Sequence, residues 1–314
     1  MEESFEKIKI IIKNLNKTMK YIHKKEGYLY TFLFFDIIWC YIRYGITYNE
    51  YRIFEFYNLD SDRRKTYISK RKYKKIRKKL VSDEIINVIE DKELFLRRFK
   101  DYINYDLRDI NNMSFKDFEN LAISNKKVIA RSPNNSFLSS YKKYDIKDYR
   151  SPAFVLDDIK NKKLFIVSKD FKQNKKLSEI DDLVIVNIVS VVNGNNIDLV
   201  SSSIKFKDDN KIISGNINIK KNYITGHLKD MNGHDYDRIY NEFEIPYFNK
   251  VKDLCTCLAR ELEEIRQVEW SFIIGEDEKI YLIDANVWND YIFSQTPEFL
   301  KNKIGLMAYY KKVI

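Results

Sequence analysis

Hydrophobic residues recur at helical spacing over about the first 80 positions. Four of them lie at intervals of three and four residues, which places them on one face of a helix: Phe5, Ile8, Ile12 and Leu15. Residues 28–42 are almost entirely apolar, but they are about five residues too few to cross a bilayer, and they include Asp36. The pattern therefore predicts a helical N-terminal region in which residues 28–42 form a buried helix.

The pattern changes to strand-like alternation after residue 127. Eight segments are rich in β-branched or aromatic residues and are bounded by turn-forming or polar residues, at positions 128–131, 154–158, 164–168, 182–192, 198–206, 217–226, 269–275 and 280–287. One long helix, at residues 247–267, interrupts them and carries apolar residues at core spacing. Helices followed by strands, without regular alternation of the two, indicate an α+β fold and not a doubly wound parallel sheet.

The composition is that of a folded protein. Of the 314 residues, 44% are hydrophobic and 32% are charged, which excludes both a disordered polar chain and a membrane bundle. Cys40, Cys255 and Cys257 are too few, and unsuitably spaced, for a disulfide framework or a zinc site. The N-terminus begins with acidic residues and lacks the order of a signal peptide. We therefore expect a soluble, cytoplasmic protein with no transmembrane segment.

The net charge of +10 arises from one segment. Between Arg63 and Lys79 there are 11 Lys or Arg and no Asp or Glu, so the rest of the chain is nearly neutral. This segment is predicted to form one basic helix, and three interpretations of it are open: a solvated surface, docking on an anionic lipid or glycan, and nucleic-acid binding. A nucleic-acid partner is the least expected, because the aromatic residues nearby fit helical core spacing and not a stacking platform.

A predicted hairpin near the C-terminus carries the clearest chemical signal. A two-residue tip at residues 277–278 pairs Ser271 with Asp284, and the same register pairs Glu269 with Asn286. One face of this hairpin then carries four polar residues and two apolar ones: Glu269, Ser271, Ile273, Leu282, Asp284 and Asn286. Oxygen ligands on adjacent strands suit a Mg²⁺ ion that bridges nucleotide phosphates. A solvated outer face of the hairpin is the alternative.

The sequence Leu-Ile-Asp-Ala-Asn at residues 282–286 resembles the carboxylate-x-Asn motif of the ATP-grasp superfamily. The segment before it, and the segments around residues 30–67 and 91–133, resemble the sugar-transfer-associated or teichuronopeptide-type ATP-grasp family. The resemblance implies a helical N-terminal domain at residues 1–82 and two ATP-grasp-like subdomains, at residues 83–165 and 166–314. It also implies that ATP and Mg²⁺ bind between the subdomains.

The resemblance implies an activity as well. ATP-grasp ligases activate a carboxylate as an acyl phosphate, which an amine or another nucleophile then attacks. The family association suggests a small-molecule or glycan substrate in the biosynthesis of a bacterial surface polysaccharide. Carried over position by position, it yields candidate nucleotide-binding residues, Lys92, Arg131, Ser136 and Lys169, and candidate metal ligands, Asp284, Asn286 and Glu269.

Several positions depart from the family pattern. The loop after Arg131 contains no glycine, although glycine lets backbone N–H groups approach phosphates closely. Ser271 occupies the place of an aspartate, and Ser190 the place of an arginine. Glu269 could restore the missing carboxylate from the diagonal position. The rival hypothesis is a catalytically degenerate ATP-grasp protein that binds a nucleotide, a glycan or a partner protein without turnover.

Overall fold

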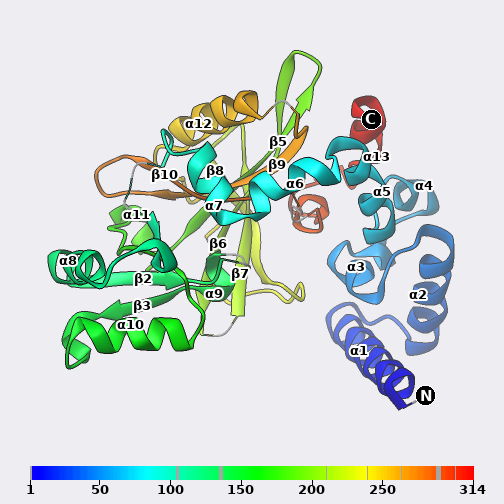
Figure 1. Cartoon of the computed structure of the whole chain (residues 1–314). Helices are drawn as coiled ribbons and strands as arrows, with labels where there is room; N and C mark the ends of the chain where they lie inside the picture. Colours follow the sequence, from blue (N-terminus) through cyan, green and yellow to red (C-terminus); the bar gives the residue numbers. More distant parts are fainter. Residues whose placement is uncertain are drawn as a thin grey trace.

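Two antiparallel sheets and a group of N-terminal helices make up the fold in the computed structural model (Figure 1). The structure describes residues 2–103, 105, 107–133, 137–209, 211–238, 240–262, 264–287, 291–300 and 302–314. The predicted α+β class with a helical N-terminal region is confirmed.

The N-terminal region consists of short helices that end at clear sequence signals. They are α1 (Glu2–Glu26), α2 (Tyr30–Tyr44), α3 (Tyr48–Ile53), η1 (Phe56–Asn58), α4 (Ser61–Lys65) and α5 (Lys70–Leu80). Gly45 ends α2 in the left-handed conformation, with φ of 72°, and Thr47 begins α3 with a capping box to Glu50. Asp60 caps α4 and Ser69 caps α5, so the predicted single basic helix is in fact two helices.

The prediction that residues 28–42 form a buried helix is half wrong. One face of α2 packs on the neighbouring helices through Leu33, Ile37, Cys40 and Tyr44, whereas the opposite, equally apolar face is exposed. Among the residues that the structure describes, no helix is long and apolar enough to cross a membrane.

Helices α6 (Asp83–Glu90) and α7 (Lys92–Arg98) lead into the first sheet. Its strand order is β1-β4-β2-β3, formed by β1 (Leu107–Asp109), β4 (Ile166–Lys169), β2 (Lys127–Arg131) and β3 (Lys142–Asp145). Helices α8 (Phe115–Asn125) and α10 (Pro152–Asn161) bury one face of this sheet. Because β4 belongs to it, the predicted boundary between residues 165 and 166 falls inside the sheet.

The predicted strand at residues 154–158 is wrong, because these residues belong to helix α10. Residues 154–158 were expected to be a strand because a short apolar run fits a strand and a buried helix equally well. Pro152 at the start of α10 is the signal that favours the helix, because proline is well tolerated in the first turn.

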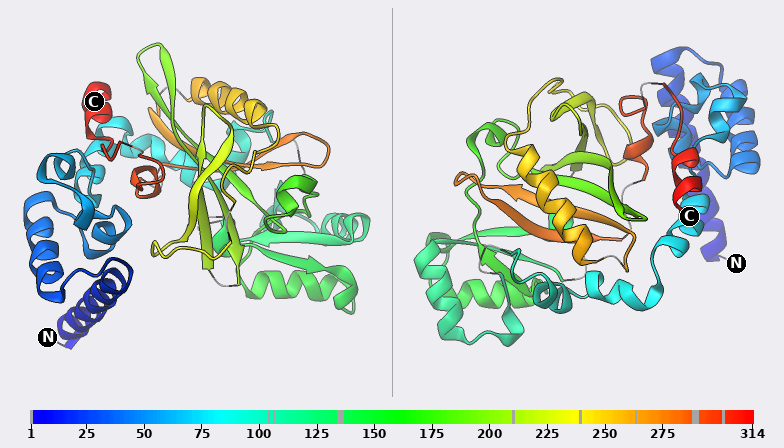
Figure 2. Two further views of the ribbon diagram at one scale, coloured as in Figure 1. Left: turned by 180° about the vertical axis from the view of Figure 1, so that it is seen from behind. Right: turned by 90° about the horizontal axis from the view of Figure 1, so that it is seen from above.

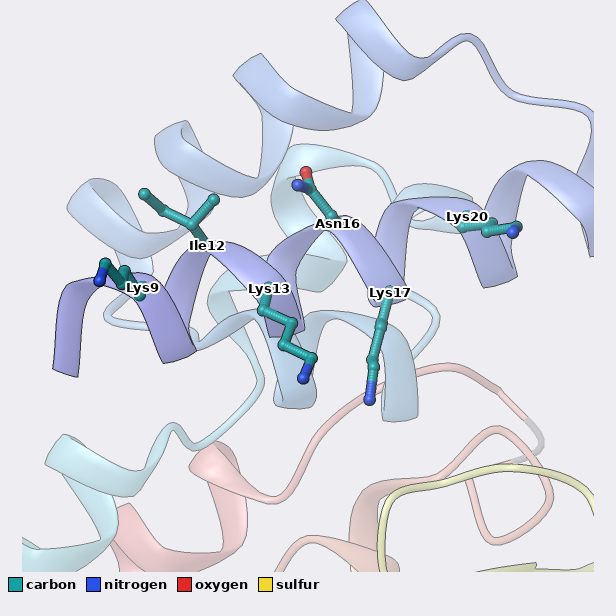
Figure 3. A pocket seen from close by; sticks show the side chains of 6 residues that line it. All are labelled: Lys9, Ile12, Lys13, Asn16, Lys17 and Lys20. Atoms are coloured by element: carbon teal, nitrogen blue, oxygen red, sulfur yellow. The ribbon is translucent and has the colours of Figure 1, made fainter. Parts of the chain in front are cut away.

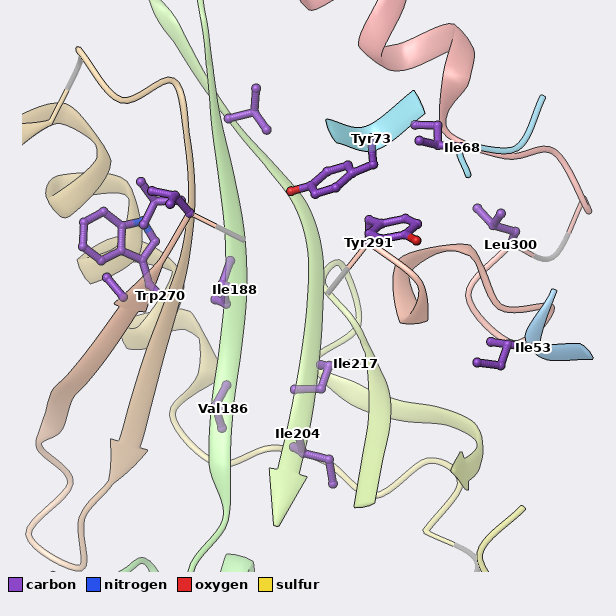
Figure 4. Close-up of a cluster of buried hydrophobic side chains, with 14 of the residues drawn as sticks. Ile53, Ile68, Tyr73, Val186, Ile188, Ile204, Ile217, Trp270, Tyr291 and Leu300 are labelled. Carbon is purple, nitrogen blue, oxygen red and sulfur yellow. The ribbon is translucent and has the colours of Figure 1, made fainter. Parts of the chain in front are cut away.

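The second sheet has the order β10-β9-β5-β6-β7-β8. Its strands are β5 (Ile185–Asn193), β6 (Asn196–Asp208), β7 (Lys211–Asn218), β8 (Tyr223–Asp230), β9 (Gln267–Ile274) and β10 (Ile280–Asn286). Helix α12 (Phe248–Glu261) packs on one face of it, where Trp270 and Ile188 lie in the main hydrophobic cluster (Figure 4). The remaining short elements are η2 (Ile110–Asn112), α9 (Phe137–Ser140), η3 (Ile146–Asp148), α11 (Lys175–Ser178), η4 (Phe293–Gln295) and α13 (Met307–Val313).

The helical region and the second sheet share one hydrophobic core. Tyr73 of α5 stacks on Tyr291 with ring centroids 4.6 Å apart (Figure 4), and Gln267 of β9 donates to the Tyr73 hydroxyl at 2.6 Å. Near the C-terminus, the backbone N–H of Met307 donates to the Thr66 carbonyl. These contacts fix α5 against the strands and α13 against the segment between α4 and α5.

A separate buried cluster joins the inward faces of the two sheets. Ile129 of β2 meets Ile185 of β5 and Ile273 of β9 there. Aromatic side chains fill the rest of the space, and the rings of Tyr105 and Phe171 meet edge to face with their centroids 4.8 Å apart. The candidate site lies at the border of this cluster.

Candidate functional site between the two sheets

The β9–β10 hairpin has the predicted register where the polar residues lie. Asp284 pairs with Ser271, and Asn286 pairs with Glu269. The predicted two-residue tip is wrong, however, because Ile274 pairs with Ile280 and residues 275–279 form the loop.

A bulge between Leu282 and Asp284 absorbs the resulting shift of one residue. Leu282 consequently joins the core face with Trp270, and Tyr281 joins Ile273 on the other face, the reverse of the predicted assignment. The bulge also matters for the site, because the carbonyl of Ile283 accepts a hydrogen bond from Arg131 Nη2 at 3.0 Å.

Asp284 is the centre of a buried charge cluster built from three separate elements. Lys92 Nζ of α7 lies 2.5 Å from Asp284 Oδ1, and Arg131 Nη1 of β2 lies 3.1 Å from Oδ2. The backbone N–H of Ala285 also donates to Oδ1, at 2.9 Å. All three charged residues are buried, and Arg131 exposes only 1% of its surface.

Local structure explains how each cation reaches the carboxylate. Asp91 caps α7, which makes Lys92 its first residue, and the Lys92 amine lies 5.4 Å from the centre of the Phe95 ring. Arg131 ends β2, and its guanidinium lies 5.3 Å from the centre of the Phe137 ring. Aromatic rings therefore support both cations as they point toward Asp284.

The cluster has an excess of positive charge. Burial opposes ionisation of Asp284, but the charges of Arg131 and Lys92 outweigh it and hold the pKa of this carboxyl below its ordinary value. Among the described residues, one carboxylate then faces two cations. Within the described part of the chain, neither Arg131 Nε nor the buried Tyr105 hydroxyl has a hydrogen-bond partner. Burial raises the pKa of Tyr105, so its hydroxyl stays protonated as a donor. Surplus positive charge and unfilled donors suit an anionic ligand.

A second polar group continues along the same sheet. Glu269 is buried, and Lys205 of β6 holds its carboxylate at 3.0 Å. Beside it, the Ser271 hydroxyl donates to Asn187 Oδ1 at 2.6 Å. Eight residues line a cavity of about 10 Å³, enough for about one water molecule: Asn187, Val189, Ser201, Ser202, Ser203, Asn216, Glu269 and Ser294.

The structure brings some predicted site residues together and leaves others apart. Lys92, Arg131 and Asp284 form one cluster, and Glu269 and Asn286 follow on the same hairpin. Lys169 does not join them. It pairs with Val128 and so projects toward the helix-covered face of the first sheet, whereas Arg131 and Ile129 project from the opposite face. Ser136 lies outside the described residues.

The departure at Ser190 lies outside the cluster. Ser190 alternates with Ile188 on the core face of β5, where Trp270 Nε1 donates to its hydroxyl at 2.9 Å. The structure therefore supplies no reason to expect a phosphate contact at this position.

Three residues that the sequence did not single out belong to the site: Tyr105, Asn187 and Lys205. Three consecutive serines at residues 201–203 were a visible sign of a polar surface on this strand. No signal in the sequence pointed to Lys205, because its contact with Glu269 crosses β5, which lies between β6 and β9 in the sheet.

No family model and no curated protein matches this sequence. Solved structures that it resembles include a carboxyaminoimidazole ribonucleotide synthase from Aspergillus clavatus complexed with ATP. The two are 10% identical, with a TM-score of 0.41 over 69% of this chain and 53% of that chain. The ATP-grasp ligase PsnB complexed with a minimal precursor is 12% identical, with a TM-score of 0.43 over 68% and 56%. D-alanyl-alanine synthetase A from Vibrio cholerae is 9% identical, with a TM-score of 0.44 over 72% and 63%. The chain thus covers less than two thirds of each of these proteins.

Proposed function

We propose that this protein binds the phosphates of ATP at the Lys92–Arg131–Asp284 cluster and uses ATP to join a carboxylate to an amine. The observation that carries the proposal is the charge imbalance of this cluster, with two buried cations around one carboxylate at the junction of two sheets. An anionic ligand would balance the second cation and accept from the unfilled Arg131 Nε donor.

Each residue has a defined part in this proposal. Lys92 and Arg131 would hold phosphate oxygens and stabilise the charge that shifts as the terminal phosphoryl group moves from ATP to the substrate carboxylate. The amine would then attack the acyl carbon, and phosphate would leave. In this role both cations act by position and charge, without a covalent step of their own.

Mg²⁺ fits the oxygen donors that the hairpin provides. Mg²⁺ in nucleotide sites commonly takes one or two carboxylates, phosphate oxygens and water. Asp284 and Glu269 would supply the two carboxylates, and Asn286 an amide oxygen. Among the described residues no group of three or more His, Cys, Asp or Glu forms a ready metal site, so phosphate oxygens would have to complete the shell.

Nucleotide entry requires a movement. Arg131 is almost fully buried, and aromatic side chains fill the space between the sheets. A triphosphate therefore reaches the cluster only when the first sheet and the hairpin separate. The proposal includes this opening.

A second candidate function is binding without turnover. Both carboxylates are already paired with cations, which favours this candidate. Asp284 pairs with Lys92 and Arg131, and Glu269 pairs with Lys205. These pairs leave less negative charge for a metal ion. A nucleotide, a glycan or a partner protein would then be the ligand. The small-molecule or glycan acceptor, the role in bacterial surface polysaccharide biosynthesis and the cytoplasmic location rest on the sequence resemblance alone.

Nucleotide binding and turnover separate the two candidates. We expect millimolar Mg-ATP to raise the melting temperature, because a ligand at a hundredfold excess over its dissociation constant adds about 2.7 kcal/mol. ADP release that requires both a carboxylate and an amine from a substrate panel would establish the ligase. Binding with no ADP release across the panel favours the second candidate. If Mg-ATP produces no thermal shift and calorimetry detects no heat of binding, nucleotide binding is rejected altogether.

A further inference from the structure

The outward face of α2 is a continuous apolar surface. Nine neighbouring residues each expose between 38% and 73% of their surface: Leu29, Tyr30, Phe32, Phe34, Phe35, Ile38, Trp39, Tyr41 and Ile42. None of them is charged. Apolar surfaces of this extent on folded proteins mark interaction sites.

The rest of the described chain does not cover this face. In Figures 1 and 2, α2 lies at the rim of the molecule that is farthest from the two sheets, with α3 on its inner side. The inner face of α2 already packs through Leu33, Ile37 and Cys40. An external partner is therefore needed to cover the outer face.

Helix α1 also exposes apolar side chains. Its apolar stripe is buried at Met19 and Ile22, but Ile12, Ile8 and Phe5 continue the stripe into solvent. Its other exposed residues include Lys9, Lys13, Lys17 and Lys20 beside Ile10 and Ile11. Figure 3 shows Lys13 and Lys17 pointing to one side of α1 and Ile12 and Asn16 to the other.

Basic side chains flank both ends of the α2 surface. Exposed Lys20 and Lys24 precede it, and Arg43 follows it. The hydrogen bond between Tyr44 and Ser61 brings α4, with its exposed basic residues, next to the C-terminal end of α2. Residues 1–82 hold 20 Lys or Arg against nine Asp or Glu.

The acidic residues close to this surface are largely balanced. Asp36 is neutralised by Arg64 on the inner side of α2. Asp60 and Asp62 pair with Arg63 and Lys65, so α4 adds no net charge, and Glu26 lies next to Lys24 in the sequence. The positive charge at the margin of the apolar face is therefore that of the exposed Lys20, Lys24 and Arg43.

We propose that α2 docks on an anionic lipid bilayer, with its outward aromatic face in the headgroup region and the flanking Lys and Arg on acidic headgroups. Phe and Ile would enter the acyl boundary, while Trp39 and Tyr41 have the amphipathic rings typical of membrane interfaces. Fifteen helical residues span about 22 Å, less than the hydrocarbon core of about 30 Å, so α2 lies on the bilayer and does not cross it.

Charge favours a lipid surface over a second copy of this chain. A two-fold dimer through α2 would place two positively charged margins against each other, and this repulsion opposes association. An anionic bilayer instead attracts every cation near its surface. The docking is independent of the proposed nucleotide site, so either proposal can fail without the other.

Vesicle flotation tests this proposal with a matched pair of double variants. Phe35→Ser/Ile42→Ser removes two outward side chains of α2, and Ile123→Ser/Phe154→Ser removes two exposed apolar side chains of α8 and α10. On vesicles with about 30 mol% phosphatidylserine in phosphatidylcholine, we expect the first variant to bind at least about tenfold more weakly and the second to bind like the unaltered protein. Binding should also fall between about 0.1 M and about 1 M salt, as the Debye length shortens.

Tryptophan fluorescence provides a second readout. Trp39 is exposed, Trp270 is buried, and the third tryptophan, Trp288, lies outside the described residues. Entry into the bilayer should shift the emission to shorter wavelength, and Trp39→Phe should abolish most of that shift. No flotation of the unaltered protein, or undiminished flotation of Phe35→Ser/Ile42→Ser, overturns the proposal. A dimer without lipid that dissociates in Phe35→Ser/Ile42→Ser, with no vesicle binding, would instead assign this face to a protein partner and also overturn it.

Discussion

Two aspartates whose side chains are mostly covered differ in one respect that separates structure from function. The side chains of Asp36 and Asp284 are equally buried, at 12% and 11% exposure. Asp36 accepts two hydrogen bonds of 2.7 Å from Arg64 and one of 2.5 Å from the Tyr51 hydroxyl. Arg64 Nε donates to the Phe56 carbonyl, so one carboxylate faces one cation, and all three nitrogens of that cation are paired.

Asp284 has two cations, and they come from positions 192 and 153 residues away in the chain. Arg131 Nε remains unpaired among the described residues. A balanced, saturated ion pair holds a fold together, whereas an unbalanced one retains capacity for a ligand. This difference is the physical basis for assigning function to Asp284 and structure to Asp36.

Removing either carboxylate should produce the largest effect. Asp284→Asn leaves two buried cations unpaired, which costs about 3–5 kcal/mol of unfolding free energy in urea denaturation, and Asp36→Asn leaves the partly buried Arg64 unpaired at a smaller cost. We expect tripolyphosphate to restore stability to Asp284→Asn and not to Asp36→Asn. The Asp284→Asn protein holds two neighbouring cations that a polyanion can bind together, whereas the Asp36→Asn protein holds one. Asp62→Asn, at an exposed pair, serves as the control and should cost less than about 1 kcal/mol. If tripolyphosphate stabilises Asp36→Asn and Asp284→Asn equally, or stabilises neither, the functional distinction between the two aspartates is wrong.

The hairpin offers a smaller and more local test. If Glu269 replaces the carboxylate that Ser271 lacks, Glu269→Gln should weaken the magnesium-dependent part of ATP binding by about tenfold. Ser271→Asp should partly restore it in the Glu269→Gln protein, because residue 271 lies directly opposite Asp284. Calorimetric titration of ATP with and without magnesium measures the loss in Glu269→Gln and its recovery with Ser271→Asp. An unchanged affinity in Glu269→Gln, together with a loss in Asp284→Asn, would show that Glu269 serves only Lys205.

The pH dependence should show the smallest effect. Because the pKa of Asp284 lies below its ordinary value in the folded protein, its contribution to stability is complete above the unfolded pKa of about 3.9 and is lost as the pH falls through the lower folded pKa. Each unit of this shift corresponds to about 1.4 kcal/mol. The unfolding free energy of Asp284→Asn should therefore fall less than that of the unaltered protein between about pH 5 and about pH 2. Parallel profiles would mean that the two cations do not hold the carboxylate in its charged form.

Some of this site could be predicted from the sequence. The pairing of Asp284 with Ser271 was predicted from a two-residue tip that the structure does not have, and it holds because the bulge compensates for the difference of one residue. The bulge at Ile283 could not be predicted, since it depends on the loop closure between Gly275 and Lys279 and on a contact with Arg131 from another sheet. The meeting of Lys92, Arg131 and Asp284 followed from the family resemblance and not from any periodicity.

Residues 28–42 illustrate the other limit. Apolar composition predicted the helix, and a buried position was inferred from it. Burial depends on which elements pack nearby, and the sequence of α2 does not contain that information. The exposed face of α2 is therefore a property that only the tertiary structure reveals.

Isothermal titration of Mg-ATP into the unaltered protein, Lys92→Met, Arg131→Met and Arg97→Met is the most direct test of the central claim. Arg97 lies on α7 close to Lys92, but it is exposed and pairs with Glu93 at the surface, which makes it the matched control. The account predicts binding by the unaltered protein and by Arg97→Met, and a loss of about tenfold to a hundredfold in Lys92→Met and in Arg131→Met, since each removes a hydrogen bond to a charged group. Circular dichroism of the same samples confirms that each variant is folded. Equal affinity in all four folded proteins, or no binding by any, would contradict the claim that this cluster holds nucleotide phosphates.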